Sequence, residues 1–246
     1  MPFLVSVLLI AALTGCAGPG SPPRRAAPES VRIWWSTSEL GILRLADIDS
    51  ELAKPFEGGI TLTNSAKEKS LAADCATARD LQARGYAAQY PRDIALLGIW
   101  TAKCLTLTAL RTAQPAQAAF MPLPPYSARL IEFLPAALAP ALSGAQRVAI
   151  ERATKGGEPI RMVESTVAFE AARDEEIHIN GEGWQETLVV LAKADFDGDD
   201  KQDWLLRADL AVERGTYRNS RLFLISRISP ESVMIVKREL KPLALN

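Results

Sequence analysis

Residues 187–212 read TLVVLAKA, then DFDGDDKQ, then DWLLRADLAV, so an acidic segment separates two apolar runs. The second run alternates apolar and polar residues from Trp204 to Val212, and a period of two indicates a strand with one buried face. The first run is almost continuously apolar and indicates another strand. Two strands joined by a short polar loop predict an antiparallel pair.

The same alternation recurs on both sides of this pair. It covers residues 163–169, 177–179, 221–227 and 233–238, and Asn180-Gly181 is a strong signal for a hairpin turn. Short turns between strands are typical of an antiparallel meander with one face buried and the other in water. We therefore expect an antiparallel β region of about six strands over residues 159–246.

Helical patterns precede this β region. Residues 66–84 and 92–111 are rich in Ala, Leu, Lys and Arg, and Gly85 and Pro91 interrupt them. The apolar run from Ile94 to Leu110 predicts a buried core helix with Trp100 inside, and Lys103 within the run argues against a transmembrane span. Residues 113–142 contain many prolines and predict loops with short helical turns, and Ser143 would cap a helix over 144–154.

Cys75 and Cys104 are equidistant from the Gln89–Tyr90 step. In an antiparallel helical hairpin, equal rise along both arms brings the two cysteines to one level, which predicts a disulfide. The alternative is a pair of buried free thiols. The predicted fold class is α+β, in which a disulfide-linked helical hairpin precedes the β-meander.

The acidic segment carries the residue types that bind a hard cation. Carboxylates at Asp195, Asp197, Asp199 and Asp203 suit calcium, which takes six to eight oxygen ligands. The pattern resembles the D-x-D-G-D-x-x-x-D loop of FG-GAP and VCBS-type repeats. That resemblance implies calcium ligands at those four aspartates and at the carbonyl of Lys201. Those families repeat the unit around a propeller, whereas this chain has one copy and no internal period. The alternative is an acidic, solvated hairpin loop.

The N-terminus has the features of an export signal. Residues 1–15 contain no Asp, Glu, Lys or Arg, and their apolar run is too short to span a bilayer. Leu13-Thr14-Gly15-Cys16 resembles the lipobox of bacterial lipoproteins. The resemblance implies cleavage before Cys16, which would carry a diacylglycerol thioether and an N-acyl chain such as palmitate. Ala17 at the next position, in place of Asp, implies sorting to the outer membrane. The alternative is an ordinary signal peptide with a chance cysteine.

These expectations divide the chain into four parts. Residues 1–15 are the signal peptide and 16–30 the lipidated cysteine with a flexible tether, since four prolines in 17–30 exclude regular structure. Residues 31–158 are mixed and mainly helical, and 159–246 form the β region with the calcium-type loop.

Composition and isolated residues limit the function. The chain has 28 Lys and Arg against 29 Asp and Glu, which lacks the basic footprint of a nucleic-acid-binding protein. The single histidine, His178, falls on the polar face of a predicted strand and is interpreted as a surface residue.

The expected function is a non-enzymatic binding or assembly module, stiffened by calcium. It would be held at the outer membrane by lipid and face the periplasm, with an envelope protein or glycan as its partner. Two alternatives stay open: a hydrolase of envelope polymers with catalytic carboxylates among Glu164, Glu170 and Asp174, and an inhibitor of a secreted enzyme.

Overall fold

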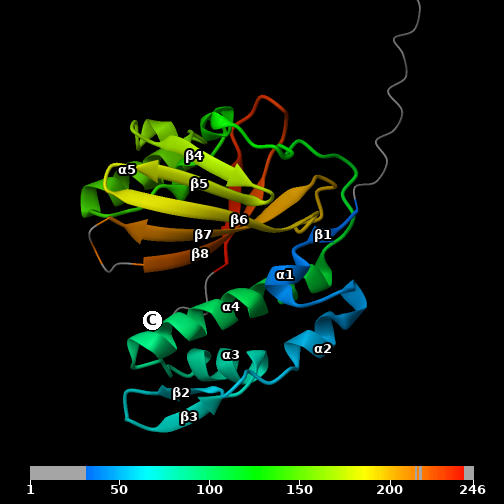
Figure 1. The fold of residues 1–246 in the computed structure, drawn as a ribbon, viewed down its shortest axis with the longest axis vertical. Coiled ribbons are helices and arrows are strands. Elements are labelled where there is room, and N and C mark those ends of the chain that lie inside the picture. The colour runs from blue at the N-terminus through cyan, green and yellow to red at the C-terminus, as the bar shows by residue number, and fades with distance from the viewer. Residues whose placement is uncertain (1–31, 214, 216–217, 241–246) are drawn as a thin grey trace, which may run out of the picture.

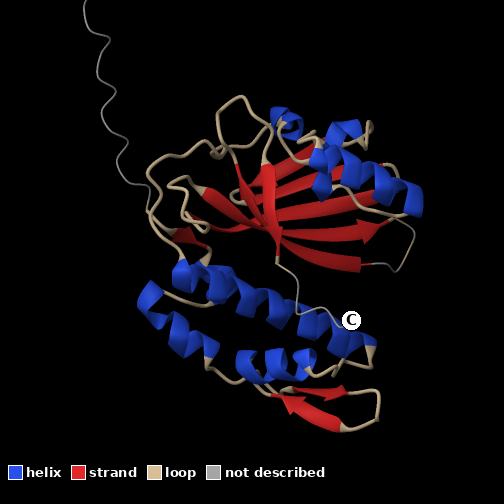
Figure 2. Ribbon diagram, turned by 180° about the vertical axis from the view of Figure 1, so that it is seen from behind, coloured by secondary structure: helices blue, strands red, loops and turns tan. Residues whose placement is uncertain are grey.

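A computed structural model of the chain describes residues 32–213, 215 and 218–240. The predicted signal peptide 1–15 and the whole of 16–30, with Cys16 and the tether, lie outside the described residues. Figure 1 shows a twisted sheet with a layer of helices beneath it, in which α4 runs between the sheet and α3. Figure 2, from behind, shows α5 and short helical turns on the opposite side of the sheet.

The sheet is the predicted antiparallel meander. Its strands follow in the order β4-β5-β6-β7-β8-β9, and β1 (Trp34–Trp35) pairs with the end of β6. The bounds are β4 Ala168–Arg173, β5 Glu176–Gly181, β6 Trp184–Ala194, β7 Asp203–Val212, β8 Arg218–Ser226 and β9 Ile235–Glu239. The six expected strands are confirmed, although the first begins later than expected, because Ile160–Met162 forms a 3-10 turn, η4.

The turn between β5 and β6 lies two residues beyond the predicted Asn180-Gly181. Gly181 still pairs with Trp184, and the chain reverses at Glu182-Gly183, where Gly183 takes a φ of +76°. Gly181 is needed for a different reason: a Cβ built on it would lie 2.4 Å from the Trp184 ring. The glycine marks a close side-chain approach, and the turn itself lies elsewhere.

Both faces of the central strands are buried, which corrects the expectation of one face in water. On one face Trp184, Trp204 and Phe223 pack with the 3-10 turns η2 (Ala128–Glu132), η3 (Ala136–Leu138) and η4. On the other, Leu191 and Leu205 pack against residues of α4 (Pro91–Thr112). The near-continuous apolar run of β6 is the pattern of a strand covered on both sides.

The disulfide between Cys75 and Cys104 is present. Its closed loop, with a sequence separation of 29, stabilises the fold by about 3–4 kcal/mol in the chain-entropy model. It joins the first turn of α3 (Cys75–Ala83) to α4.

The predicted helix start at residue 66 is wrong. Lys69–Ala72 forms strand β3, which pairs with β2 (Ile60–Thr63). Asp74 then caps α3 through a reciprocal capping box with Thr77, which starts the helix at Cys75. With 9 residues in α3 and 22 in α4, the hairpin does not have the two matched arms that were expected.

The expectation that α4 is a buried core helix is also wrong. Leu97, Leu107 and Leu110 are buried, but Ile94 and Ile99 are 55% and 66% exposed. Trp100 is half-buried and stacks on Phe56 with ring centroids 4.0 Å apart. Among the described residues α4 alone is long and apolar enough to cross a membrane by length and composition, a property shared by helices that pack on a protein core.

The remaining helices lie around this frame. Ser143 accepts a hydrogen bond from the Gln146 amide and caps α5 (Gly144–Lys155), as predicted. Two short helices, α1 (Thr37–Leu40) and α2 (Ile48–Leu52), lie beside α4, with the 3-10 turn η1 (Leu45–Asp47) between them.

A buried ion pair attaches η3 to the sheet. Arg221 of β8 donates to the carbonyls of Ala137 and Leu138 at 3.1 and 2.7 Å, and to the Glu186 carboxylate at 3.3 Å. The second oxygen of Glu186 is buried without a hydrogen-bond partner. Burial raises the pKa of Glu186 to about 7, although the charge of Arg221 acts in the opposite direction.

Glu186→Gln is expected to stabilise the protein more at pH 8 than at pH 5. The pKa of Glu186 rises from 4.5 in the unfolded chain to about 7 in the fold. The folded state therefore binds the extra proton between these values, and this contribution to stability is lost as the pH rises through them. The glutamine side chain does not titrate, so the variant avoids that loss. The loss in the free energy of unfolding amounts to up to about 3 kcal/mol at pH 8.

Urea unfolding of both proteins at pH 5 and pH 8 measures the difference. Glu182→Gln, at an exposed turn position, is the matched control and should change neither value. An identical gain for Glu186→Gln at the two pH values would contradict the prediction.

Candidate metal centre

The acidic loop, residues 195–202, joins β6 to β7 and is docked on the segment that follows α4. Gln114 and Asp195 exchange two backbone hydrogen bonds of 2.9 Å. The Asp200 carbonyl accepts from the amides of Gln117 and Ala118 at 2.7 and 3.1 Å. These bonds satisfy the backbone at both ends of the loop and hold it against the body of the protein.

The loop is wound around the carboxylate of Asp195, which is 3% exposed. One of its oxygens accepts from the amides of Gly198 at 2.7 Å and Asp197 at 3.2 Å, and the other from Asp200 at 2.9 Å. Asp200 stands where an EF-hand loop has glycine, and it adopts the left-handed conformation with φ +65°. An aspartate tolerates this conformation better than most side chains do.

Three of the four predicted carboxylates converge. Oxygens of Asp195, Asp197 and Asp203 lie within 4.8 Å of one another. Asp203, the first residue of β7, is fully buried, and one of its oxygens accepts from the Phe196 amide at 3.1 Å. Burial, together with the nearby carboxylates of Asp197 and Asp199, raises the pKa of Asp203 to about 6.

The interior of the cluster has unsatisfied oxygen atoms. Asp203 Oδ1 is buried without a hydrogen-bond partner, and so is the hydroxyl of Ser226. Ser226 follows Ile225, which pairs with Trp204, so it lies beside Asp203 across the β7–β8 ladder. Its hydroxyl is close enough to lower the pKa of Asp203 without forming a hydrogen bond of good geometry.

Asp199, the fourth predicted ligand, is not part of this cluster. Its carboxylate lies 3.3 Å from the ammonium groups of both Lys201 and Lys237. The Lys201 carbonyl stays a predicted ligand. Lys237 of β9 and Ser226 of β8 were not found from the sequence, because only the strand order places them at this loop.

The cluster has the chemistry of a site for a hard cation. All of its donors are oxygens, which suit calcium or magnesium better than a softer metal. Like charges this close disfavour one another, and a dication among them would remove the repulsion.

The carboxylates proposed for hydrolysis lie in separate places. Glu164 accepts from the Trp184 indole at 3.3 Å and from Thr166. Glu170 and Asp174 are separated by roughly 13 Å along β4 and its turn, at about 3.3 Å per residue. Asp174 is 91% exposed and pairs with Arg173. These residues do not form the convergent pair that hydrolysis requires.

His178 lies at the surface, as predicted. Its ring contacts Glu176 at 3.0 Å and the Thr187 hydroxyl at 3.2 Å. Glu175, whose side chain is 21% exposed, pairs with Lys193 and accepts from the Tyr126 hydroxyl, both at 2.6 Å. Burial and this glutamate raise the pKa of Tyr126.

Comparison with protein-family models, curated proteins and solved structures finds no match. The function is therefore argued from the geometry of this chain.

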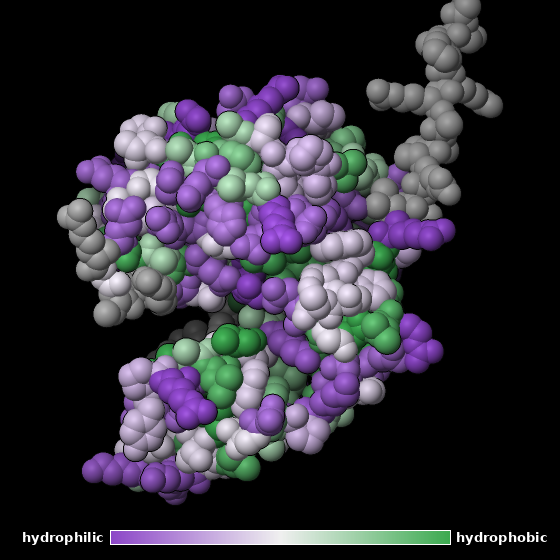
Figure 3. All heavy atoms as spheres, in the orientation of Figure 1, coloured by the Kyte–Doolittle hydropathy of each residue, from purple (hydrophilic) through white to green (hydrophobic). Residues whose placement is uncertain are grey.

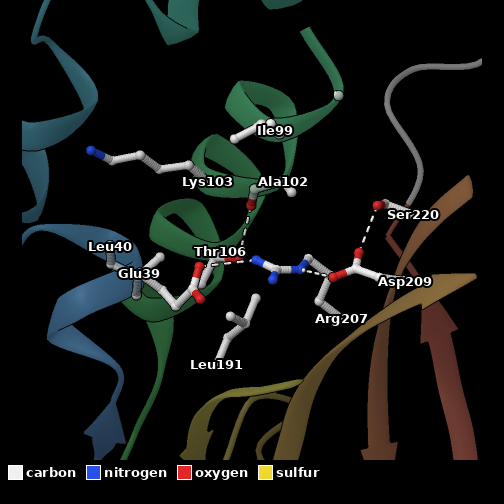
Figure 4. A pocket seen from close by; sticks show the side chains of 11 residues that line it. Glu39, Leu40, Ile99, Ala102, Lys103, Thr106, Leu191, Arg207, Asp209 and Ser220 are labelled. Atoms are coloured by element: carbon white, nitrogen blue, oxygen red, sulfur yellow. Dashed lines mark hydrogen bonds and ion pairs between the residues drawn. The ribbon is translucent and has the colours of Figure 1, made fainter. Parts of the chain in front are cut away.

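A cleft opens beside the middle of α4, between that part of the helix and the sheet. Figure 3 shows a hollow between the sheet above and the helices below, with hydrophobic side chains along its lower side. The cleft has a volume of about 430 Å³, and its lining includes Ile99 and Ala102 of α4. In Figure 4 the guanidinium group of Arg207 bridges Glu39 at 3.0 Å and Asp209 at 2.8 Å. Glu39 and Asp209 pair with Arg207, and Lys103 of the lining pairs with Glu51 outside it. The cleft therefore offers a binding surface that combines paired charges with apolar groups.

Calcium is expected to raise the melting temperature of the 17–246 fragment relative to chelator. With a Kd of roughly 10⁻⁴–10⁻³ M, as in extracellular modules, about 10 mM calcium adds about 1.4–2.7 kcal/mol. For a chain of this size that corresponds to roughly 3–10 °C. Thermal unfolding followed by circular dichroism measures the shift.

Two Asp→Asn variants test which carboxylates produce the calcium-dependent rise in melting temperature. Asp197→Asn removes a member of the cluster and should abolish the shift. Asp199→Asn, which removes a neighbouring carboxylate outside the cluster, should retain most of it. Equal melting temperatures of the unaltered fragment in calcium and in chelator would show that the loop binds no calcium.

Proposed function

We propose that this chain is an outer-membrane lipoprotein facing the periplasm, which acts as a non-enzymatic binding or assembly module stiffened by calcium. One observation carries the proposal: Asp195, Asp197 and Asp203 converge within 4.8 Å where the loop docks on the core. The carboxylates considered for catalysis do not converge. The converging acidic groups thus lie where the β6–β7 loop contacts the core.

The position of the cluster favours a structural role for the ion. Asp195 and Asp203 are 3% and 0% exposed, so only the Asp197 side is open to solvent. A catalytic metal needs an open coordination position and access for substrate. An ion here would instead fix the β6–β7 connection to residues 114–118. Calcium is the proposed ion because oxygen ligands suit it and an exported protein meets it outside the cytoplasm.

The lipid anchor is proposed from Leu13-Thr14-Gly15-Cys16. The Cys75–Cys104 disulfide supports an oxidising compartment. Two or more acyl chains anchor a protein firmly, whereas one is marginal. Residues 17–30 would extend up to about 45–50 Å at roughly 3.3 Å per residue, which places the domain clear of the membrane surface.

The proposed binding surface is the cleft between α4 and the sheet. It combines exposed apolar groups such as Ile99 with paired charges such as Arg207 and Asp209. The proposed partner is an envelope protein or glycan.

Cys16→Ser is expected to abolish incorporation of labelled palmitate and to remove the protein from the outer-membrane fraction, since no thioether can form. Fractionation with mass spectrometry of the N-terminal peptide measures both. Ala17→Asp is the matched variant: it should keep the label and move the protein to the inner membrane. Lipidation at another residue, or outer-membrane retention of Cys16→Ser, would refute the anchor.

Immobilised protein is expected to capture a specific envelope protein or glycan in calcium and to lose it in chelator. Asp197→Asn should capture less in calcium, whereas Asp199→Asn should behave as the unaltered protein. Quantitative mass spectrometry and glycan analysis of the eluates measure the enrichment. If nothing specific is enriched under either condition, the binding-module proposal is wrong.

A further inference from the structure

A cation from the protein itself lies at the candidate metal centre. The Lys237 ammonium group is 2.8 Å from an Asp197 oxygen and 3.3 Å from an Asp199 oxygen. Lys237 belongs to β9, the last strand of the sheet, whose one partner among the described strands is β8. The Lys237 ammonium group therefore links this edge strand to the loop. It supplies positive charge that a metal ion would otherwise supply.

Lys237 satisfies only the outer side of the cluster. On the inner side, Asp203 Oδ1 and the Ser226 hydroxyl are buried without partners, and both residues are fully buried. Buried polar atoms are normally hydrogen-bonded, whereas these two oxygens interact with each other in poor hydrogen-bond geometry, which leaves both able to serve a metal ion. The ammonium group pairs with Asp197 and Asp199 instead. A metal ion bound among Asp195, Asp197 and Asp203 would lie on that inner side.

We propose that Lys237 and the metal ion are alternative partners of Asp197, so that metal binding releases Lys237 and loosens β9 from the loop. The inference rests on the metal binding proposed above. Asp197 is the carboxylate shared by the ammonium group and the cluster. A dication and an ammonium group on one carboxylate repel each other, so binding of the metal weakens the hold of the lysine. Lys237 keeps its proton and moves into water.

β9 has attachments besides Lys237. Just before it Met234 donates to the Phe133 carbonyl at 2.8 Å, and just after it Leu240 donates to the Leu222 carbonyl at 2.7 Å. β9 is five residues long, Ile235–Glu239, and its ladder with β8 is interrupted between Leu224 and Ile225. Its far edge pairs with no described strand. Short edge strands open at a low free-energy cost, and an unpaired edge can accept another strand. Metal binding would thus stiffen the loop and loosen the sheet edge.

Calcium titration of the full-length chain by calorimetry tests the competition. Lys237→Gln is expected to bind calcium about 3- to 10-fold more tightly, since one partly exposed ion pair no longer competes. Lys201→Gln is the matched control: Lys201 pairs with Asp199 but not with Asp197, so its affinity should change by less than about twofold. Lys237→Arg, which keeps the charge, should bind as the unaltered chain does.

Hydrogen exchange of the unaltered chain tests the release without a variant. Saturating calcium is expected to speed exchange of the β9 amides, and to leave β9 of Lys237→Gln unchanged. Equal or weaker calcium binding by Lys237→Gln, or slower exchange in β9 with calcium, would overturn the competition and leave the metal site intact. If neither protein binds calcium, the metal site of the proposed function fails as well.

Discussion

The loop geometry depends on the carboxylate of Asp195. It stands at the end of β6, a strand covered on both faces, where the chain leaves the core. Asp195 accepts three of those amides and winds the loop around itself. That winding brings Asp197 and Asp203 close to it, and the acidic cluster is a consequence of a backbone requirement.

Patterns within one element predicted structure well. The period of two in β7 and β8 predicted the meander. The Cys75–Cys104 disulfide was also predicted, although the two matched helical arms on which its spacing argument rested are not present. Predictions failed where packing against another side chain or pairing with another strand decided the local structure. Gly181 resembles a turn residue, but the Trp184 ring requires it. Residues before Cys75 have helical composition, but pairing with β2 makes them a strand.

The candidate metal centre likewise combines residues that local spacing predicted with residues that distant strands supply. The spacing of the aspartates indicated the loop, because its ligands are close in sequence. Ser226 and Lys237 reach it from β8 and β9: the order of these strands was predicted, but the register that sets the two residues beside the loop was not. Asp199 has the spacing of a ligand, but its carboxylate pairs with Lys201 and Lys237 and lies outside the converging three, so its role as a ligand stays a prediction.

The two lysines also account for how the loop is tolerated without an ion. Four carboxylates, Asp195, Asp197, Asp199 and Asp203, would repel one another strongly in this partly buried setting. Lys201 and Lys237 offset part of that charge at the solvent side and leave the inner side unsatisfied. Such an arrangement lets the sheet form without a metal ion, while the inner oxygens of the cluster would favour binding of one. The lysines thus permit assembly of the fold, and a cation bound at the cluster would add stiffness to the loop.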